Sequence, residues 1–71
     1  MKTYHVVYDH GKWNVQKGQT VISKGHTKQS GAIRKAKAVA KKNKGELYIH
    51  KRSGSIRIRH TYGKDPFPPR G

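Results

Sequence analysis

Polar and apolar positions alternate along the first part of the chain in a way that predicts two strands. Residues 3–8 are rich in β-branched and aromatic types, which suit a pleated surface. Residues 12–17 then alternate, with Trp13 and Val15 on one side and polar residues on the other. The intervening Asp9-His10-Gly11 is typical of a tight turn, because glycine adopts positive φ without strain. Together these segments predict a β-hairpin.

A helical pattern follows the hairpin. Gly18-Gln19 is a second turn signal, and residues 20–23 predict a short third strand. Residues 28–44 then show the period of an amphipathic helix, with Thr27 as its N-cap and Gly45 as the residue that ends it. Small alanines on the apolar side of this helix allow it to lie close against a sheet. That apolar side carries Ala32, Ile33, Ala36, Val39 and Ala40.

Two further alternating segments follow the helix. Residues 46–51 and 55–60 flank Ser53-Gly54, which is a hairpin turn signal. The inward positions are Leu47, Ile49, Ile56 and Ile58. The outward positions are Tyr48, His50, Arg57 and Arg59, which we expect on the same sheet face as Lys12, Asn14 and Gln16.

The expected fold is of the α+β class. A β-hairpin, a short third strand, a helix and a second β-hairpin form a small antiparallel sheet with one helix packed on one face. Residues 1–63 form the single domain, and residues 64–71 a Pro- and Gly-rich tail whose Phe67 we expect to pack onto the domain edge. Val6 and Val7 compete for the inward position of the first strand. The expected core comprises Val6, Trp13, Val15, Ile22, Ala32, Ile33, Ala36, Val39, Ala40, Leu47, Ile49, Ile56 and Ile58.

These motifs resemble a known family of small bacterial and phage proteins, the domain of unknown function 2188 family. The resemblance covers nearly the whole chain and implies a compact ββαββ-type domain. It implies no catalytic residue, and this chain is unusually basic along the helix for that family. The matching segments are Tyr4-His5-Val6-Val7, Trp13-Asn14-Val15, Thr27-Lys28-Gln29 with the alanines of the helix, Glu46-Leu47-Tyr48-Ile49-His50, Gly54-Ser55-Ile56-Arg57 and the residues from Tyr62 to Pro69.

The charge of the chain points to an acidic partner. Lys and Arg number 17 against 3 Asp and Glu, a formal net charge of +14 over 71 residues. Such a charge favours polyanions, above all nucleic acid. The outer sheet face offers aromatic and basic groups in Tyr48, Arg57 and Arg59. The helix offers a second surface with no offsetting acid, and there we expect phosphate contacts from Arg34, Lys35, Lys37, Lys41, Lys42 and Lys44.

The sequence carries no recognisable catalytic, metal or cofactor motif, and we expect none of the three. Asp9, Glu46 and Asp65 are scattered, whereas a two-metal nuclease needs clustered carboxylates. The five histidines lack the spacing of metal ligands, although His5 and His50 are placed to approach across strands. Cysteine is absent, as is any glycine-rich phosphate loop.

The sequence also predicts where the protein resides. No apolar run approaches the ~20 residues that a membrane span needs, and the first residues lack the apolar segment of a signal peptide. We therefore expect a cytoplasmic protein without a membrane partner, associated with the nucleoid if DNA is the ligand.

These observations favour a non-enzymatic nucleic-acid-binding protein of low sequence specificity. Duplex DNA is slightly preferred over RNA, because a basic helix or a sheet docks in a groove. One alternative is a small basic adaptor or inhibitor that binds an acidic host protein. Another is a metal-free ribonuclease that uses histidine as acid and base. The sequence leaves the oligomeric state open.

Overall fold

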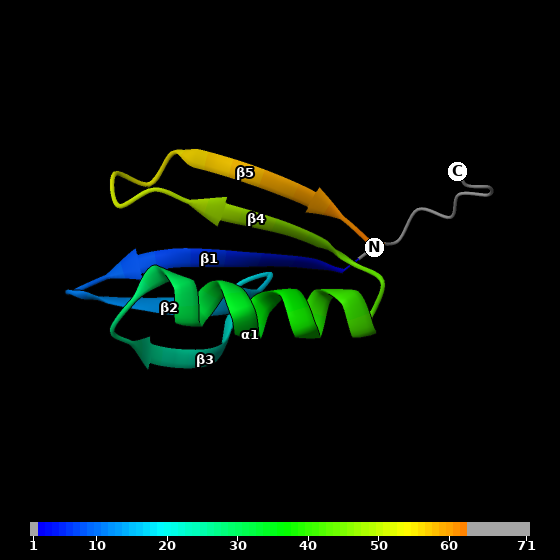
Figure 1. The fold of residues 1–71 in the computed structure, drawn as a ribbon, viewed down its shortest axis with the longest axis horizontal. Coiled ribbons are helices and arrows are strands. Elements are labelled where there is room, and N and C mark those ends of the chain that lie inside the picture. The colour runs from blue at the N-terminus through cyan, green and yellow to red at the C-terminus, as the bar shows by residue number, and fades with distance from the viewer. Residues whose placement is uncertain (1, 63–71) are drawn as a thin grey trace.

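A single helix crosses one face of a five-stranded sheet (Figure 1). The computed structural model of the chain describes residues 2–62. The α+β class is confirmed, including the third strand. The expected Pro- and Gly-rich tail of residues 64–71, with Phe67, lies outside the described residues. The elements are β1 (Thr3–Asp9), β2 (Lys12–Lys17), β3 (Thr20–His26), α1 (Gln29–Lys42), β4 (Glu46–His50) and β5 (Ile56–Thr61).

The sheet is mixed rather than wholly antiparallel. Its order is β3-β2-β1-β4-β5, and the pairing of β1 with β4 at its centre is parallel. The expectation of an antiparallel sheet is therefore wrong at this one pairing and right at the other three. Two successive antiparallel turns leave β3 running in the direction of β1. Because α1 runs back across the sheet, β4 sets out in that same direction and lies parallel to β1.

The core lies between the sheet and α1. Val6 pairs with Val15 on β2 and with Ile49 on β4, so that one row of apolar side chains crosses the middle of the sheet. Val6 is buried and Val7 is only half-buried, which settles the register of β1. Tyr4, absent from the expected core, is 1% exposed and is the largest fully buried side chain. The buried cluster comprises Tyr4, Val6, Trp13, Val15, Ala32, Ala36, Ala40, Leu47 and Ile49.

Three expected core residues are instead exposed. Ile22 is 39% exposed, Ile56 is 54% and Ile58 is 37%. Ile22 falls in an irregular part of the β2–β3 pairing. Helix α1 packs on β1, β2, β3 and β4 but not appreciably on β5, so the side of β5 that faces the helix layer, where Ile58 lies, remains uncovered. Ile56 pairs with His50 across a register shift and therefore lies on the other face of the sheet. Ile33 and Val39 pack at the margin of the core and are partly buried.

Both ends of α1 differ from expectation. We expected Thr27 as the N-cap, but the N-cap is Lys28 and the helix therefore begins one residue later, at Gln29. The backbone of Lys28 is extended, and its side chain makes no capping hydrogen bond. It ends at Lys42, and Lys44 takes the left-handed conformation, with φ of 52°. The Gly45 N–H donates to the Ala40 carbonyl at 2.9 Å, as in a Schellman motif.

Gly45 is needed for space rather than for a left-handed turn. A Cβ at this position would lie 2.6 Å from the Lys2 carbonyl oxygen and 2.9 Å from the Tyr4 ring. Lys44 therefore takes the conformation that glycine usually supplies. Within residues 2–62, no helix combines the length and apolar character that crossing a membrane requires.

Candidate nucleic-acid interface

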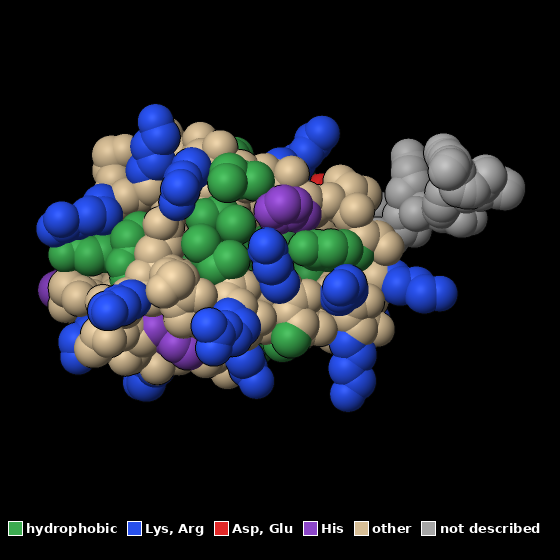
Figure 2. Space-filling view, in the orientation of Figure 1, with side chains coloured by type: hydrophobic (Ala, Val, Ile, Leu, Met, Phe, Trp, Pro, Cys, Tyr) green, Lys and Arg blue, Asp and Glu red, His purple; other side chains and the backbone are tan. Residues whose placement is uncertain are grey.

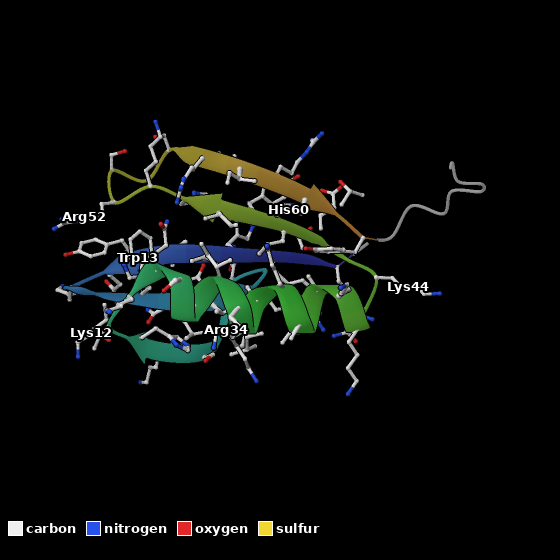
Figure 3. All side chains as sticks on the ribbon, viewed as in Figure 1. Lys12, Trp13, Arg34, Lys44, Arg52 and His60 are labelled. Carbon is white, nitrogen blue, oxygen red and sulfur yellow. The ribbon has the colours of Figure 1, made fainter. Side chains whose placement is uncertain are left out.

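Helix α1 presents its cations to solvent. On a helical wheel they lie away from Ala32, Ala36 and Ala40, which face the sheet and are fully buried. Lys44 follows the helix and projects at its C-terminal end (Figure 3). We call this set the helix surface, and its members are all exposed: Arg34, Lys35, Lys37, Lys41, Lys42 and Lys44.

The helix surface has two sides. Arg34, Lys37 and Lys41, at i, i+3 and i+7, follow one side of the exposed half of α1. Lys35 and Lys42, one heptad apart, follow the other side. Figure 2 views the molecule from the side on which α1 lies, and there the Lys and Arg side chains project separately across the face and around its rim. The surface is therefore an array of spaced cations rather than one continuous band.

In the part of the chain that the structure describes, these cations form no ion pair with an acidic side chain. Within residues 2–62, the sole ion pair is between His10 and Asp9, whose Nδ1 and Oδ1 atoms are 2.7 Å apart. Glu46 instead accepts a hydrogen bond from the Tyr48 hydroxyl. Within this part of the chain the Lys and Arg side chains therefore keep their charge available for an external anion. A cation that neutralises a phosphate releases a counterion condensed on the nucleic acid, and this release drives cationic proteins onto phosphate backbones.

Arg57 does not lie on the outer sheet face, where we expected it. Ile58 is opposite Ile49, but Ile56 is opposite His50, so Arg57 is the extra residue of a β-bulge. Its guanidinium donates to Gln29 Oε1 at 2.8 Å, at the first turn of α1. The bulge thereby moves Arg57 to the helix side of the sheet and leaves Ile56 beside His50 on the other.

Arg52 joins the helix side as well and was missed in the sequence. Its guanidinium carbon lies 4.7 Å from the centre of the Tyr8 ring, and the group donates to the Tyr8 hydroxyl at 3.1 Å. Tyr8 in turn packs edge-on against Trp13. Arg52, Tyr8 and Trp13 therefore contact one another in sequence, and Arg52 and Trp13 are labelled at one end of the sheet in Figure 3. The only signal in the sequence was a basic residue next to a hairpin turn, which does not indicate a direction.

The second sheet face is open and carries few cations. Register places one residue from each strand in a row across it, in the order Val21, Gln16, His5, Tyr48 and Arg59. Tyr48 and Arg59 therefore share this face as expected. Among the Lys and Arg residues of β2 and β5, only Lys12 and Arg59 point to this open face. Lys17 points to the helix side, because it pairs with Tyr4, which faces α1. Arg57 also points to the helix side, because of the β-bulge.

The aromatic rings of the open face are engaged with one another. His5 and Tyr48 stack with ring centres 5.2 Å apart and an angle of 17° between planes. The Tyr48 hydroxyl donates to Glu46 at 2.7 Å, which raises the pKa of Tyr48 above its usual value, with Arg59 acting in the opposite direction. A base that stacked on the occupied face of Tyr48 would have to displace His5.

His5 and His50 form a hydrogen-bonded pair. His50 Nδ1 is 2.9 Å from the Gly54 carbonyl oxygen, which can only accept, so this nitrogen carries a proton. His50 Nε2 lies 2.9 Å from His5 Nδ1, within hydrogen-bond distance. Burial, followed by the neighbouring His50, lowers the pKa of His5 below its usual value. The contact leaves no room for a phosphate between the rings, as an acid–base pair in a ribonuclease would need.

Two further histidines make contacts with neighbouring side chains. Ser23 Oγ and His26 Nε2 are 2.7 Å apart on β3, and His60 stacks on Tyr62. Across residues 2–62, no three His, Asp or Glu side chains come together as a set of metal ligands.

An exposed basic helix on a five-stranded sheet with one open face defines a small α+β domain with a cationic side. A family model described as an uncharacterised protein conserved in bacteria, DUF2188, matches residues 4–62, and the chain belongs to this family. The resemblance seen in the sequence motifs is thereby confirmed. None of the curated proteins and none of the solved structures compared with the chain matches it.

Proposed function

We propose that this protein is a non-enzymatic nucleic-acid-binding protein of low sequence specificity, and that the helix surface makes the main contact. The observation that supports this most directly is that, among residues 2–62, no carboxylate forms an ion pair with an exposed Lys or Arg side chain. Five of the six residues of the helix surface are lysines, which act as flexible point charges. Phosphate contacts of this kind give affinity without sequence information.

Two features favour the helix surface over the open sheet face. Arg57 and Arg52 contact groups on the helix side, so they add charge there. Of the Lys and Arg residues of β2 and β5, the open face keeps Lys12 and Arg59, and its Tyr48 is engaged with His5 and Glu46. If the ligand is DNA, the protein belongs with the nucleoid in the cytoplasm.

The test is the dependence of binding on salt. We expect the affinity for a short DNA duplex, measured by fluorescence anisotropy, to fall steeply as NaCl is raised. In the triple variant R34Q/K37Q/K41Q, the slope of log affinity against log salt should become shallower by about 2–3, because each lost phosphate contact removes about 0.9 from it.

The matched control is the triple variant K12Q/K24Q/K51Q, which removes the same charge from exposed positions outside α1. It should retain most of the slope. Equal loss in the two triple variants would show that net charge alone matters and would remove the helix surface as the site. Binding that is absent at low salt, or insensitive to salt, would defeat the proposal altogether.

A further inference from the structure

We infer that the ligand is B-form duplex DNA and that α1 lies in its major groove; this inference rests on the proposed function. The helix packs on one face of the sheet, and the residues of its outer half are exposed to solvent. An α-helix with its side chains is about 10–12 Å across, and the major groove is about 12 Å wide and about 8.5 Å deep. Its 14 residues give a length of about 21 Å.

Cations on both sides of α1 match the two walls of such a groove. On the helical wheel, Lys37 points to one side, and Lys35 and Lys42 point to the other. A helix lying across a single phosphate strand would use one side alone. A helix within a groove meets a phosphate strand on each side, which this two-sided arrangement fits.

The outermost line of the helix suits close approach to the base edges. By helical spacing, Gly31 and Ala38 lie on it together with Arg34 and Lys41. The two small residues leave room for the groove floor. Arg34 projects from the middle of the exposed half, where a guanidinium reaches base edges or phosphates alike (Figure 3).

The arginines beside the first turn of α1 extend the same surface. Arg57 is held at Gln29 by a 2.8 Å hydrogen bond, and Arg52 lies over Tyr8 at the neighbouring end of the sheet. With α1 in the groove, both are placed to meet the phosphate strand on the β5 side. The bulge that diverts Arg57 therefore serves this docking geometry.

Other nucleic acids fit less well. Single strands are held largely by stacking on aromatic faces, whereas Tyr48 is stacked on His5 and Trp13 is 7% exposed. Duplex RNA has a deep, narrow major groove that a helix does not enter. The observations therefore favour B-form DNA over both.

Two measurements test the groove assignment. The first compares a plain DNA duplex with one that carries glucosylated hydroxymethylcytosine, whose sugars fill the major groove and leave the phosphates unchanged. We expect the modified duplex to bind at least about tenfold more weakly, and duplex RNA of the same sequence to bind as weakly, at a single fixed salt concentration.

The second compares A38E with T61E, which place the same new charge at exposed positions on α1 and on β5. Affinity for plain duplex DNA should fall about tenfold in A38E and about twofold in T61E, after thermal unfolding shows that both fold. Equal losses in both variants, or full binding to the glucosylated duplex, would overturn the groove assignment and leave salt-dependent binding intact. No binding to any of these nucleic acids at low salt would instead overturn the proposed function.

Discussion

On the open face, the partly buried His5 of the His5–His50 pair makes stability depend on pH. Burial of His5 disfavours its charged imidazole, and the neighbouring His50 acts in the same direction. The folded protein therefore binds a proton at His5 less readily than the unfolded chain does.

The sign of the resulting pH effect follows from linkage. Because the pKa of folded His5 is below its unfolded value of 6.5, the unfolded state takes up the proton first as the pH falls. The contribution of His5 is fully present above pH 6.5 and is lost as the pH falls through the folded pKa. We expect urea unfolding between pH 8 and pH 5 to show a smaller loss of stability in H5F than in the original protein.

H5F retains a ring to stack on Tyr48 but removes both the titrating group and its hydrogen bond to His50, so the slope of stability against pH is compared rather than stability itself. G31A adds no titratable group and offers a control that leaves the pair in place. Parallel stability curves for H5F and the original protein would show that His5 does not resist protonation in the fold.

At the scale of elements, the junction between α1 and β4 is closely packed. Gly45 is buried there, and the Glu46 N–H donates to the Lys2 carbonyl at 2.8 Å, which ties β4 to the start of β1. A methyl group at Gly45 would meet backbone and an aromatic ring, neither of which can move cheaply. We expect G45A to lower the free energy of unfolding in urea by about 1–3 kcal/mol through overpacking.

The control for this prediction is G31A, in the first turns of α1. The nearest atom to a Cβ there is His26 Nδ1 at 3.7 Å, an ordinary contact. G31A should raise stability by about 0.5–1 kcal/mol, because alanine loses less entropy in a helix. Equal effects of the two substitutions would contradict the special role of Gly45.

Much of this element structure was predictable from alternation in the sequence. The strands around Trp13 and Leu47 and the alanine side of α1 were all expected, because their periods match their geometry. The position of Arg57 was not, since a bulge depends on how β5 pairs with β4 and leaves no mark on the local pattern. The same holds for the parallel β1–β4 pairing, which follows from where α1 crosses the sheet. Burial of Tyr4 depends on that crossing too.

The candidate site was predictable in composition but not in arrangement. The six residues of the helix surface were all identified in the sequence, because five of them lie on the side of α1 away from the alanines and Lys44 follows directly after the helix. Arg52 and Arg57 lie on the same side of the molecule as these six residues. Their positions depend on contacts between residues distant in sequence, Arg52 with Tyr8 and Arg57 with Gln29. Which of the two basic surfaces carries more charge was therefore a question for the structure.

For the whole molecule, a formal net charge of +14 should make folding sensitive to ionic strength. Mutual repulsion of the cations opposes the compact state, and salt screens it, since the Debye length falls from about 30 Å at 0.01 M to about 8 Å at 0.15 M. We expect the Tm to rise by about 4–8 °C over this range, which corresponds to roughly 1 kcal/mol in a domain of this size.

R34Q/K37Q/K41Q should show a smaller rise than the original protein over the same range, because it has less repulsion to screen. A Tm that is flat or falls with salt would mean that the cations are already neutralised within the fold.

The central parallel pairing also sets an order of events during synthesis. Strand β1 leaves the ribosome with its hairpin partner β2, but Val6 must wait for Ile49 before its other edge is covered. In that interval the growing polypeptide exposes a bare strand edge to its neighbours. Other copies of the chain carry the same positive charge and are repelled from this edge. The charge that favours binding to a polyanion therefore also protects the partly folded domain from aggregation.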